Sequence, residues 1–254
     1  MFKLTIENAK KWKHSIDAVV NLISEGHIEI GKDGISIKAM DPSQIAMVSF
    51  SMPKSAFLQY DVPTPTKIGV NFDNLSRILG RARENEKLEI SDEKNKLQLE
   101  FFAAKKKRSF KVPSIDIREG VQKEPSITHD AIVRMNAGQF KETLKDAELV
   151  SSHITLEATP ESFNVEVHGE GSDLMVESDK TSEEITELTV KPESSVKGRV
   201  RATFPLQYLL DIVKACSDSE SVAINLKSNA PIKIEYSVED ANIVYYLAPR
   251  IETE

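Results

Sequence analysis

Cysteine is almost absent from this 254-residue sequence, in which Cys216 stands alone. This scarcity excludes intramolecular disulfides and thiolate metal clusters. Long apolar runs are missing too, since no stretch approaches the roughly 20 residues that a helix needs to cross a bilayer. The first residues interrupt their apolar segment with Lys3 and Glu7 and lack the core of a signal peptide. We therefore expect an intracellular, soluble protein with no membrane partner.

Catalytic and cofactor-binding motifs are also scarce. The five histidines match neither HExxH nor another spacing of metal ligands, so we predict no metal site. The segment HGEGSD at His168 lacks the third glycine of a dinucleotide-binding loop. Bare SxxK matches at Ser51 and Ser91 lack the companion motifs of serine acylases. Because no nucleophile, paired carboxylates or phosphate loop stands out, we predict a protein that is not an enzyme, with no catalytic residue and no cofactor.

Positive charge is in deficit overall, because 40 acidic residues outnumber 33 basic ones and give a net charge of −7. This balance argues against a protein that coats nucleic acid with a basic surface. The charges are nevertheless segregated along the chain. Acidic residues crowd into 157–193, whereas basic residues gather at 10–13, 77–83 and 105–108. This segregation is therefore compatible with local contacts between basic patches and the phosphates of a nucleic acid.

What the sequence does contain is an internal repeat. Residues 8–24 and 136–151 both begin at Asn-Ala, place an aromatic residue in the first turn and continue with apolar residues at helical spacing. Each predicted helix is followed by a His-Ile pair, at His27 and His153, and by a hairpin of alternating strands. The two halves therefore begin in the same way.

The repeat continues with a second predicted helix in each half. A short strand ending in Phe leads into it at 68–82 and again at 200–215. Asp73 is the predicted N-cap of the first of these helices, and Pro205 is predicted to lie in the first turn of the second.

Each half closes with two more alternating strands, at 88–101 and 222–236. The polar segment between the halves lacks periodicity and is predicted to be an exposed connector. We therefore predict an α+β fold of two topologically similar domains, residues 1–117 and 131–254, joined by a connector at 118–130. Each domain is expected to be an antiparallel sheet with its helices on one face.

Basic side chains recur on the exposed faces of the predicted helices. Any one such face is compatible with ordinary solvation. Their recurrence in an acidic chain, without a set of residues that reads bases, favours sequence-independent contacts with DNA phosphates. The basic run at 103–110 is predicted to be a solvated hairpin turn, with an accessory DNA contact as the alternative. The candidate DNA-facing residues are Lys10, Lys13, His14, Arg77, Arg81, Lys141, Lys145 and Lys214.

Three segments carry a resemblance to a known family: DGISIKAMDPSQIAMVSF (33–50), IGVNFDNLSRIL (68–79) and YYLAPRIE (245–252). In this order and spacing they resemble the proliferating cell nuclear antigen family in its archaeal form, over essentially the whole chain. The resemblance implies a head-to-tail ring of three chains, with antiparallel sheets outside and helices lining the interior. It implies a DNA sliding clamp, a replication processivity factor that encircles duplex DNA and is placed there by an ATP-dependent clamp loader.

The resemblance also implies where partners bind. DNA polymerase, flap endonuclease and DNA ligase would insert a short PIP-type peptide, with a glutamine and apolar anchors, into a hydrophobic groove under the connector. By position, the groove residues are Met40, Gln44, Ile45, Met47, Ile127, Pro231, Tyr246, Ala248 and Pro249. The edge strands that pair between subunits would carry Phe110 and Val112 on one side, and Leu174 and Val176 on the other.

Within this resemblance the cationic helix faces line the channel. Glu142 and Gln207 stand where a basic residue is expected, so the lining of the second half is predicted to be less positive. The expected compartment is the cytoplasm, at the nucleoid of an archaeon, or the nucleus of a eukaryote. One alternative is a checkpoint-type clamp subunit or an obligate member of a heterotrimer. The other is an enzyme on a duplicated α+β scaffold, which requires a pocket with convergent titratable groups.

Overall fold

A computed structural model describes residues 1–117, 123–191 and 198–250 of the chain. The chain divides into two compact units. The first unit comprises Met1–Pro42, Val48–Lys123 and Ser237–Ile243, and the second comprises Ser43–Met47, Glu124–Tyr236 and Val244–Glu254. The domain limits that we predict from the sequence, 1–117 and 131–254, stay a prediction.

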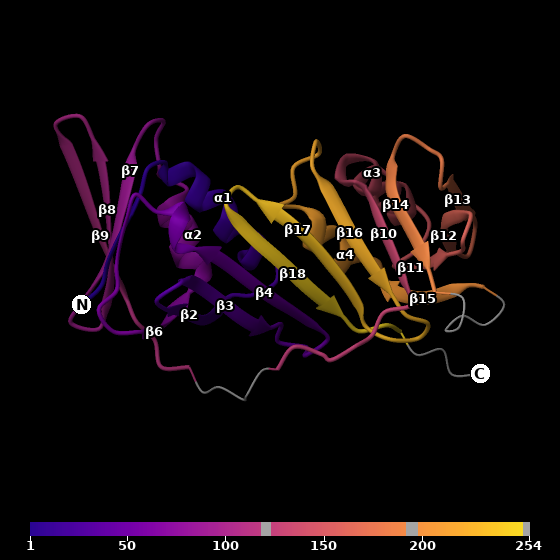
Figure 1. The fold of residues 1–254 in the computed structure, drawn as a ribbon, viewed down its shortest axis with the longest axis horizontal. Helices are drawn as coiled ribbons and strands as arrows, with labels where there is room; N and C mark the ends of the chain where they lie inside the picture. The colour runs from indigo at the N-terminus through magenta and orange to yellow at the C-terminus, as the bar shows by residue number, and fades with distance from the viewer. Residues whose placement is uncertain (118–122, 192–197, 251–254) are drawn as a thin grey trace. The chain divides into compact units, whose positions relative to one another are not determined.

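The first half of the chain contains two α-helices among nine strands in its described residues (Figure 1). In chain order the elements are β1 (Lys3–Ile6), α1 (Ala9–Val20), β2 (Glu25–Ile30), β3 (Gly34–Met40), β4 (Ala46–Pro53), the short 3-10 helix Lys54–Ala56, β5 (Gln59–Asp61), β6 (Thr66–Asn71), α2 (Phe72–Leu79), β7 (Lys87–Glu93), β8 (Lys96–Ala103) and β9 (Lys106–Pro113).

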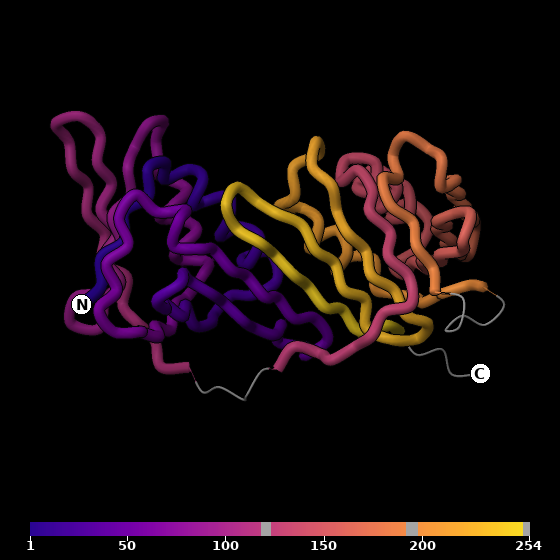
Figure 2. Tube along the Cα trace, viewed as in Figure 1, coloured from indigo at the N-terminus to yellow at the C-terminus, as the bar shows by residue number. Residues whose placement is uncertain are grey.

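The second half repeats this pattern in its described residues. Its elements are β10 (Ala131–Asn136), α3 (Ala137–Glu148), β11 (His153–Ala158), β12 (Ser162–His168), β13 (Asp173–Asp179), β14 (Ile185–Val190), β15 (Val200–Pro205), α4 (Leu206–Val213), β16 (Ser221–Leu226), β17 (Ile232–Val238) and β18 (Ala241–Leu247). Figure 2 allows the same succession to be followed along the chain trace.

Strand order confirms the internal repeat and the α+β fold. Hydrogen-bonded neighbours in the first half run β5-β1-β7-β8-β9 and β4-β3-β2-β6. In the second half they run β14-β10-β16-β17-β18 and β13-β12-β11-β15. Each strand of the first half has a counterpart at the same place in the second, and the pairs are antiparallel. The sequence pattern of hairpins around two helices therefore gives the same topology twice.

The Asn-Ala signal begins the first helix of each half, as predicted. The Asn8 side chain accepts a hydrogen bond from the Lys10 backbone N–H at 3.0 Å, and Asn136 accepts one from Gln139 at 3.0 Å. These caps satisfy backbone donors that the first helical turn leaves unpaired. Apolar residues at helical spacing then bury one face of each helix, and α1 packs beside α2 as α3 packs beside α4.

Two predicted helix starts are wrong by one or two residues. Asn71, not Asp73, caps α2, because its Oδ1 accepts from the Asn74 backbone N–H at 2.8 Å as soon as β6 ends. Asp73 lies in the first turn, where a carboxylate is favourable near the positive end of the helix dipole. Pro205 is the N-cap of α4, one residue before its first turn.

The segments that leave the last strand of each half make the same contact. After β9, the Ile115 backbone N–H donates to the Gly69 carbonyl on β6 at 3.0 Å. After β18, the Arg250 backbone N–H donates to the Thr203 carbonyl on β15 at 2.8 Å. Since β6 and β15 are counterparts, the segment that leads from β9 to the connector and the described part of the C-terminal segment are equivalent elements of the repeat.

Candidate nucleic-acid and peptide-binding surfaces

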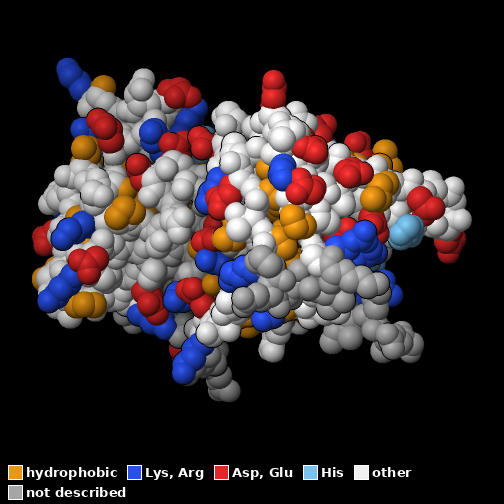
Figure 3. All heavy atoms as spheres, turned by 45° about the vertical axis from the view of Figure 1, so that its right-hand side comes forward, with side chains coloured by type: hydrophobic (Ala, Val, Ile, Leu, Met, Phe, Trp, Pro, Cys, Tyr) orange, Lys and Arg blue, Asp and Glu red, His pale blue; other side chains and the backbone are white. Residues whose placement is uncertain are grey.

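Most of the predicted DNA-facing cations contact carboxylates. His14 Nδ1 lies 3.6 Å from Glu239, and Lys145 Nζ lies 2.7 Å from Glu142. The remaining contacts are the ion pairs Lys10–Glu84, Lys13–Asp17 and Lys141–Asp218. Figure 3 shows basic and acidic side chains interspersed on the face of the molecule that it presents. Pairing within the chain reduces what these side chains can offer to a phosphate.

Lys141 is engaged most completely among these cations. Its Nζ donates to the Cys216 carbonyl at 2.5 Å and to Asp218 Oδ1 at 2.7 Å, and its side chain is only 16% exposed. It therefore ties α3 to the turn between α4 and β16. The sequence placed Lys141 on a helix face but gave no sign that residues 75 positions away would bind it.

Arg77, Arg81 and Lys214 differ from the others. All three are exposed, and none of them forms an ion pair with another residue that the structure describes. Arg77 Nη2 donates only to Asn74 Oδ1, at 3.3 Å. Arg77 lies in the last turn of α2, and Arg81 follows the C-cap Gly80 in a turn that its own backbone N–H closes by donating to the Ile78 carbonyl at 3.0 Å. These cations are the most available of the predicted set.

Only Ala104 and Lys105 of the basic run at 103–110 form the turn of the predicted hairpin, because β8 ends at Ala103 and β9 begins at Lys106. Arg108 is the exception to this prediction, because it is neither solvated nor free to contact DNA. Its guanidinium binds Glu86, which is 2% exposed, and lies over the Phe101 ring. Alternation along β9 turns Arg108 to the opposite face from its neighbours.

Several predicted groove residues lie together in the second unit. The Ala248 backbone N–H donates to the Ile45 carbonyl at 2.8 Å, which joins the segment before β4 to the segment after β18. Ile45, Ile127, Pro231, Ala248 and Pro249 are half-buried and apolar, Met47 and Tyr246 are buried, and Gln44 is exposed. Half-buried apolar side chains next to an exposed amide suit the binding of a peptide.

The described part of the connector contacts this surface. The Tyr246 hydroxyl donates to Glu124 at 3.4 Å, and His129 Nε2 lies 3.2 Å from the Pro231 carbonyl. Burial, and then the Glu124 carboxylate, raise the pKa of Tyr246 to about 12. Met40 belongs to the first unit. Connector residues 118–122 lie outside the described residues. The end of the YYLAPRIE segment, from residue 251, lies outside them as well.

Replacing His129 by Gln is expected to flatten the loss of stability in mild acid. Burial lowers the pKa of His129 from its ordinary value of 6.5, and the charges of Lys233 and Lys227 lower it further. The Pro231 carbonyl and Glu235 raise the pKa but do not cancel this decrease. The unfolded imidazole then takes up its proton at higher pH than the folded one, so stability falls as pH decreases below about 6.5. Urea unfolding at a series of pH values measures this, and an unchanged pH slope in His129→Gln would contradict it.

The residues predicted at subunit contacts lie on strands at the ends of their sheets. Phe110 on β9 packs edge-on against Phe101, with ring centroids 5.8 Å apart, and Val112 is 2% exposed. Leu174 and Val176 on β13 are half-buried. β9 ends the order β5-β1-β7-β8-β9, and β13 ends the order β13-β12-β11-β15. An end strand with apolar side chains can pair with another chain.

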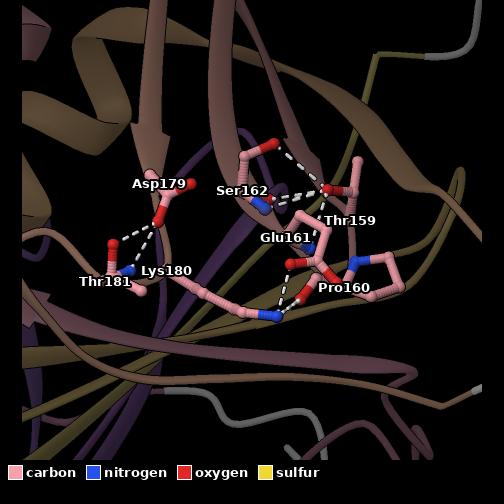
Figure 4. A network of polar contacts seen from close by, with 7 residues as sticks. All are labelled: Thr159, Pro160, Glu161, Ser162, Asp179, Lys180 and Thr181. Atoms are coloured by element: carbon pink, nitrogen blue, oxygen red, sulfur yellow. Dashed lines mark hydrogen bonds and ion pairs between the residues drawn. The ribbon is translucent and has the colours of Figure 1, made fainter.

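A polar network fixes the chain where β13 ends, beside the turn between β11 and β12 (Figure 4). The Ser162 backbone N–H donates to Thr159 Oγ1 at 2.9 Å within that turn. Asp179 Oδ1 accepts from the Thr181 backbone N–H at 2.8 Å and from its hydroxyl at 2.6 Å, which lowers the pKa of Asp179. The Lys180 backbone N–H donates to the Glu161 carbonyl at 2.9 Å. This network defines the end of the strand.

The described part of the chain was also compared with the requirements of metal sites and of membrane-spanning helices. No group of three or more His, Cys, Asp or Glu side chains there could hold a metal ion. None of the helices in that part is both long and apolar enough to span a membrane.

Two family models together match nearly the whole sequence. The N-terminal domain of proliferating cell nuclear antigen matches residues 1–119, and its C-terminal domain matches residues 123–251. The chain belongs to the proliferating cell nuclear antigen family. Among its relatives, a DNA polymerase sliding clamp of Methanococcus vannielii is 37% identical over 255 residues, with 100% of both chains covered. A DNA polymerase sliding clamp of Pyrococcus furiosus is 31% identical, with 99% of both chains covered.

Solved structures of this family have the same fold. PCNA from Thermococcus kodakaraensis superposes with a TM-score of 0.91 at 24% identity, over 98% of this chain and 100% of that one. The structure of A. fulgidus PCNA with the C-terminal region of FEN-1 bound superposes with a TM-score of 0.87 at 26% identity, over 100% of both chains. The family resemblance seen in the sequence is thereby confirmed.

Proposed function

We propose that this protein is a DNA sliding clamp, a replication processivity factor that encircles duplex DNA and tethers enzymes that act on it. The match of both family domains along the whole chain carries the proposal. Relatives that match at full length are DNA polymerase sliding clamps. The protein would act as a ring of three chains closed head to tail, since an end strand on each side allows pairing from chain to chain.

The ring would hold DNA by enclosure and contact it loosely. Arg77, Arg81 and Lys214 are exposed and without carboxylate partners among the described residues, so we assign them the main phosphate contacts. Lys10, Lys13, Lys141 and Lys145 would contribute less, because each of their phosphate contacts competes with an existing ion pair. A clamp that moves along DNA must avoid base-specific contacts, each of which adds about 1–3 kcal/mol of discrimination. Salt-screened phosphate contacts satisfy this requirement.

Client enzymes would bind the apolar surface of the second unit. We assign the peptide contacts to Gln44, Ile45, Met47, Ile127, Pro231, Tyr246, Ala248 and Pro249. The complex of A. fulgidus PCNA with the C-terminal region of FEN-1 supports a short peptide as ligand, and FEN-1-like nucleases as clients. DNA polymerase and DNA ligase would bind through peptides of the same PIP type. Three equivalent surfaces in a ring would raise the effective concentration of several clients.

The clamp would have no catalytic activity of its own, because its contribution is to keep enzymes near DNA. An ATP-dependent clamp loader would place it on the duplex. We place the protein in the cytoplasm, at the chromosome, as its similarity to archaeal clamps supports.

Retention that depends on the topology of the DNA would test this function. The protein is loaded by its clamp loader onto nicked circular plasmid and then washed at about 1 M salt, where the screening length is about 3 Å and phosphate contacts are weak. We expect the protein to stay on the circle and to leave once a restriction enzyme linearises it. Gel filtration of DNA-bound protein measures both states. Release from the circle at high salt, or retention on the linear product, would contradict the proposal.

A further inference from the structure

Arg108 lies on β9, but its guanidinium reaches the chain that follows α2. Its Nη2 donates to the Arg81 carbonyl at 3.1 Å and forms an ion pair with Glu86. The same guanidinium lies over the ring of Phe101, its partner across β8 and β9, 4.9 Å from the centroid. The side chains are only 16% exposed for Arg108 and 3% for Glu86. The arginine is thus held by a carboxylate, a carbonyl and a ring.

Glu86 also accepts hydrogen bonds from other segments of the chain. Its carboxylate also accepts from the Arg83 backbone N–H at 2.9 Å, within the loop between α2 and β7. Its backbone carbonyl accepts from the N–H of Ala9, the first residue of α1, at 2.9 Å. The end of α2, the loop, the start of α1 and the strand β9 therefore meet at one buried ion pair.

The Glu86–Arg108 ion pair lies beside the chain that carries two of the three most available cations, Arg77 and Arg81. The Arg81 carbonyl belongs to the end of the α2 region, where backbone acceptors lack helical partners and a cation is favourable. Arg77 lies four residues earlier, in the last turn of α2 itself. A shift of the end of α2 would therefore move both guanidinium groups together.

We propose that Glu86 and Arg108 are positioning residues, which hold Arg77 and Arg81 where these can contact DNA phosphates. The inference rests on the proposed function. Neither Glu86 nor Arg108 touches DNA in this scheme, because both side chains are largely buried. Their effect on DNA passes through the end of α2.

The two residues can be weakened without removing their volume. Arg108→Lys keeps the charge but loses the planar fork that serves Glu86 and Arg81 together and stacks on Phe101. Glu86→Gln keeps the shape and removes the charge. Lys111→Gln is a matched control, since Lys111 lies on β9 and pairs with Glu93 at 2.5 Å, away from the α2 loop.

The test is the affinity of the assembled protein for a short linear duplex, measured by fluorescence anisotropy across a salt series. The slope of log K against log salt is negative, and each lost phosphate contact lowers its absolute value, called the slope below, by about 0.9. We expect Arg77→Ala/Arg81→Ala, Arg108→Lys and Glu86→Gln all to lower this slope, and Lys111→Gln to leave it unchanged. Adding Arg108→Lys to Arg77→Ala/Arg81→Ala should lower the slope no further, because Arg108 acts through those arginines.

Three results would overturn the inference, and light scattering first establishes that each variant assembles. An additional decrease from Arg108→Lys in the Arg77→Ala/Arg81→Ala background would mean that Arg108 contacts DNA itself. A lowered melting temperature of Arg108→Lys and Glu86→Gln with an unchanged slope would mean that the ion pair stabilises the fold and does not position Arg77 and Arg81. Absence of salt-dependent binding by the unmodified protein would refute the proposed function itself, and the inference with it.

Discussion

Phe110→Asp is expected to reduce the mass of the protein in solution from that of three chains to that of one. Phe110 is half-buried on the end strand β9, where the proposed ring would cover it with β13 of the next chain. An aspartate there would place an unpaired carboxylate in an apolar contact, at a cost of several kcal/mol for each junction. Light scattering over a dilution series measures the mass.

Leu149→Asp is the matched control for this change. Leu149 is 84% exposed and follows α3, so it lies on no end strand. The variant should keep the three-chain mass. A loss of assembly in this variant too would show that added charge, rather than the β9 contact, is responsible.

Mixing two assembly variants tests the head-to-tail arrangement directly. Leu174→Asp should disrupt the β13 side, as Phe110→Asp disrupts the β9 side. Each variant alone should be a monomer, but a mixture keeps one intact β9 and one intact β13, so concentrated mixtures should contain two-chain complexes. A mixture that stays monomeric, while each single variant folds, would argue against pairing of β9 with β13. An unmodified protein that is monomeric at every concentration would point instead to a missing partner subunit.

Ile45→Asp should weaken the binding of a PIP-type peptide by at least about 30-fold, which corresponds to a hot-spot loss of about 2 kcal/mol. The side chain of Ile45 is half-buried among the assigned peptide contacts, while its carbonyl, which holds Ala248, is unaffected by the change. Calorimetric titration with a peptide that carries a glutamine and aromatic anchors measures the affinity.

Leu58→Asp provides the comparison for the peptide experiment. Leu58 is 54% exposed and belongs to the first unit, outside the assigned surface. Its replacement should leave the affinity unchanged. If Leu58→Asp and Ile45→Asp lost equal amounts of peptide affinity, or if Ile45→Asp kept full affinity, the assigned peptide surface would be wrong.

Local signals explain why the fold could be predicted from the sequence. Asn8 and Asn136 cap helices through their own side chains, and alternation alone indicates the hairpins. The first residue of α2 does not follow from such signals, because Asn71 and Asp73 can both cap a helix and only the end of β6 decides between them. The family resemblance then supplied the assembly, which no periodicity encodes.

The electrostatics of the candidate DNA-facing surface could not be predicted in the same way. Lys10 and Lys141 bind carboxylates that lie 74 and 77 residues away in the sequence, and such pairs depend on tertiary structure. Arg108 stands in a run of basic residues that resembles a solvated turn, and the two strands β7 and β8 separate it in the sequence from its buried partner Glu86. Helix periodicity gave the exposed face of each helix but not which cations on it are already paired.

The equivalent contacts of Ile115 on Gly69 and Arg250 on Thr203 bear on how the two-domain chain arose. If one ancestral domain was duplicated and fused, the C-terminal segment of the first copy became the start of the link to the second copy. Only the second copy then kept a C-terminal segment that can end beside its sheet. A peptide surface completed by Ala248 and Pro249 can then exist once per chain rather than once per domain. In the proposed ring, fusion would thereby halve the number of client sites and leave more room for each bulky enzyme.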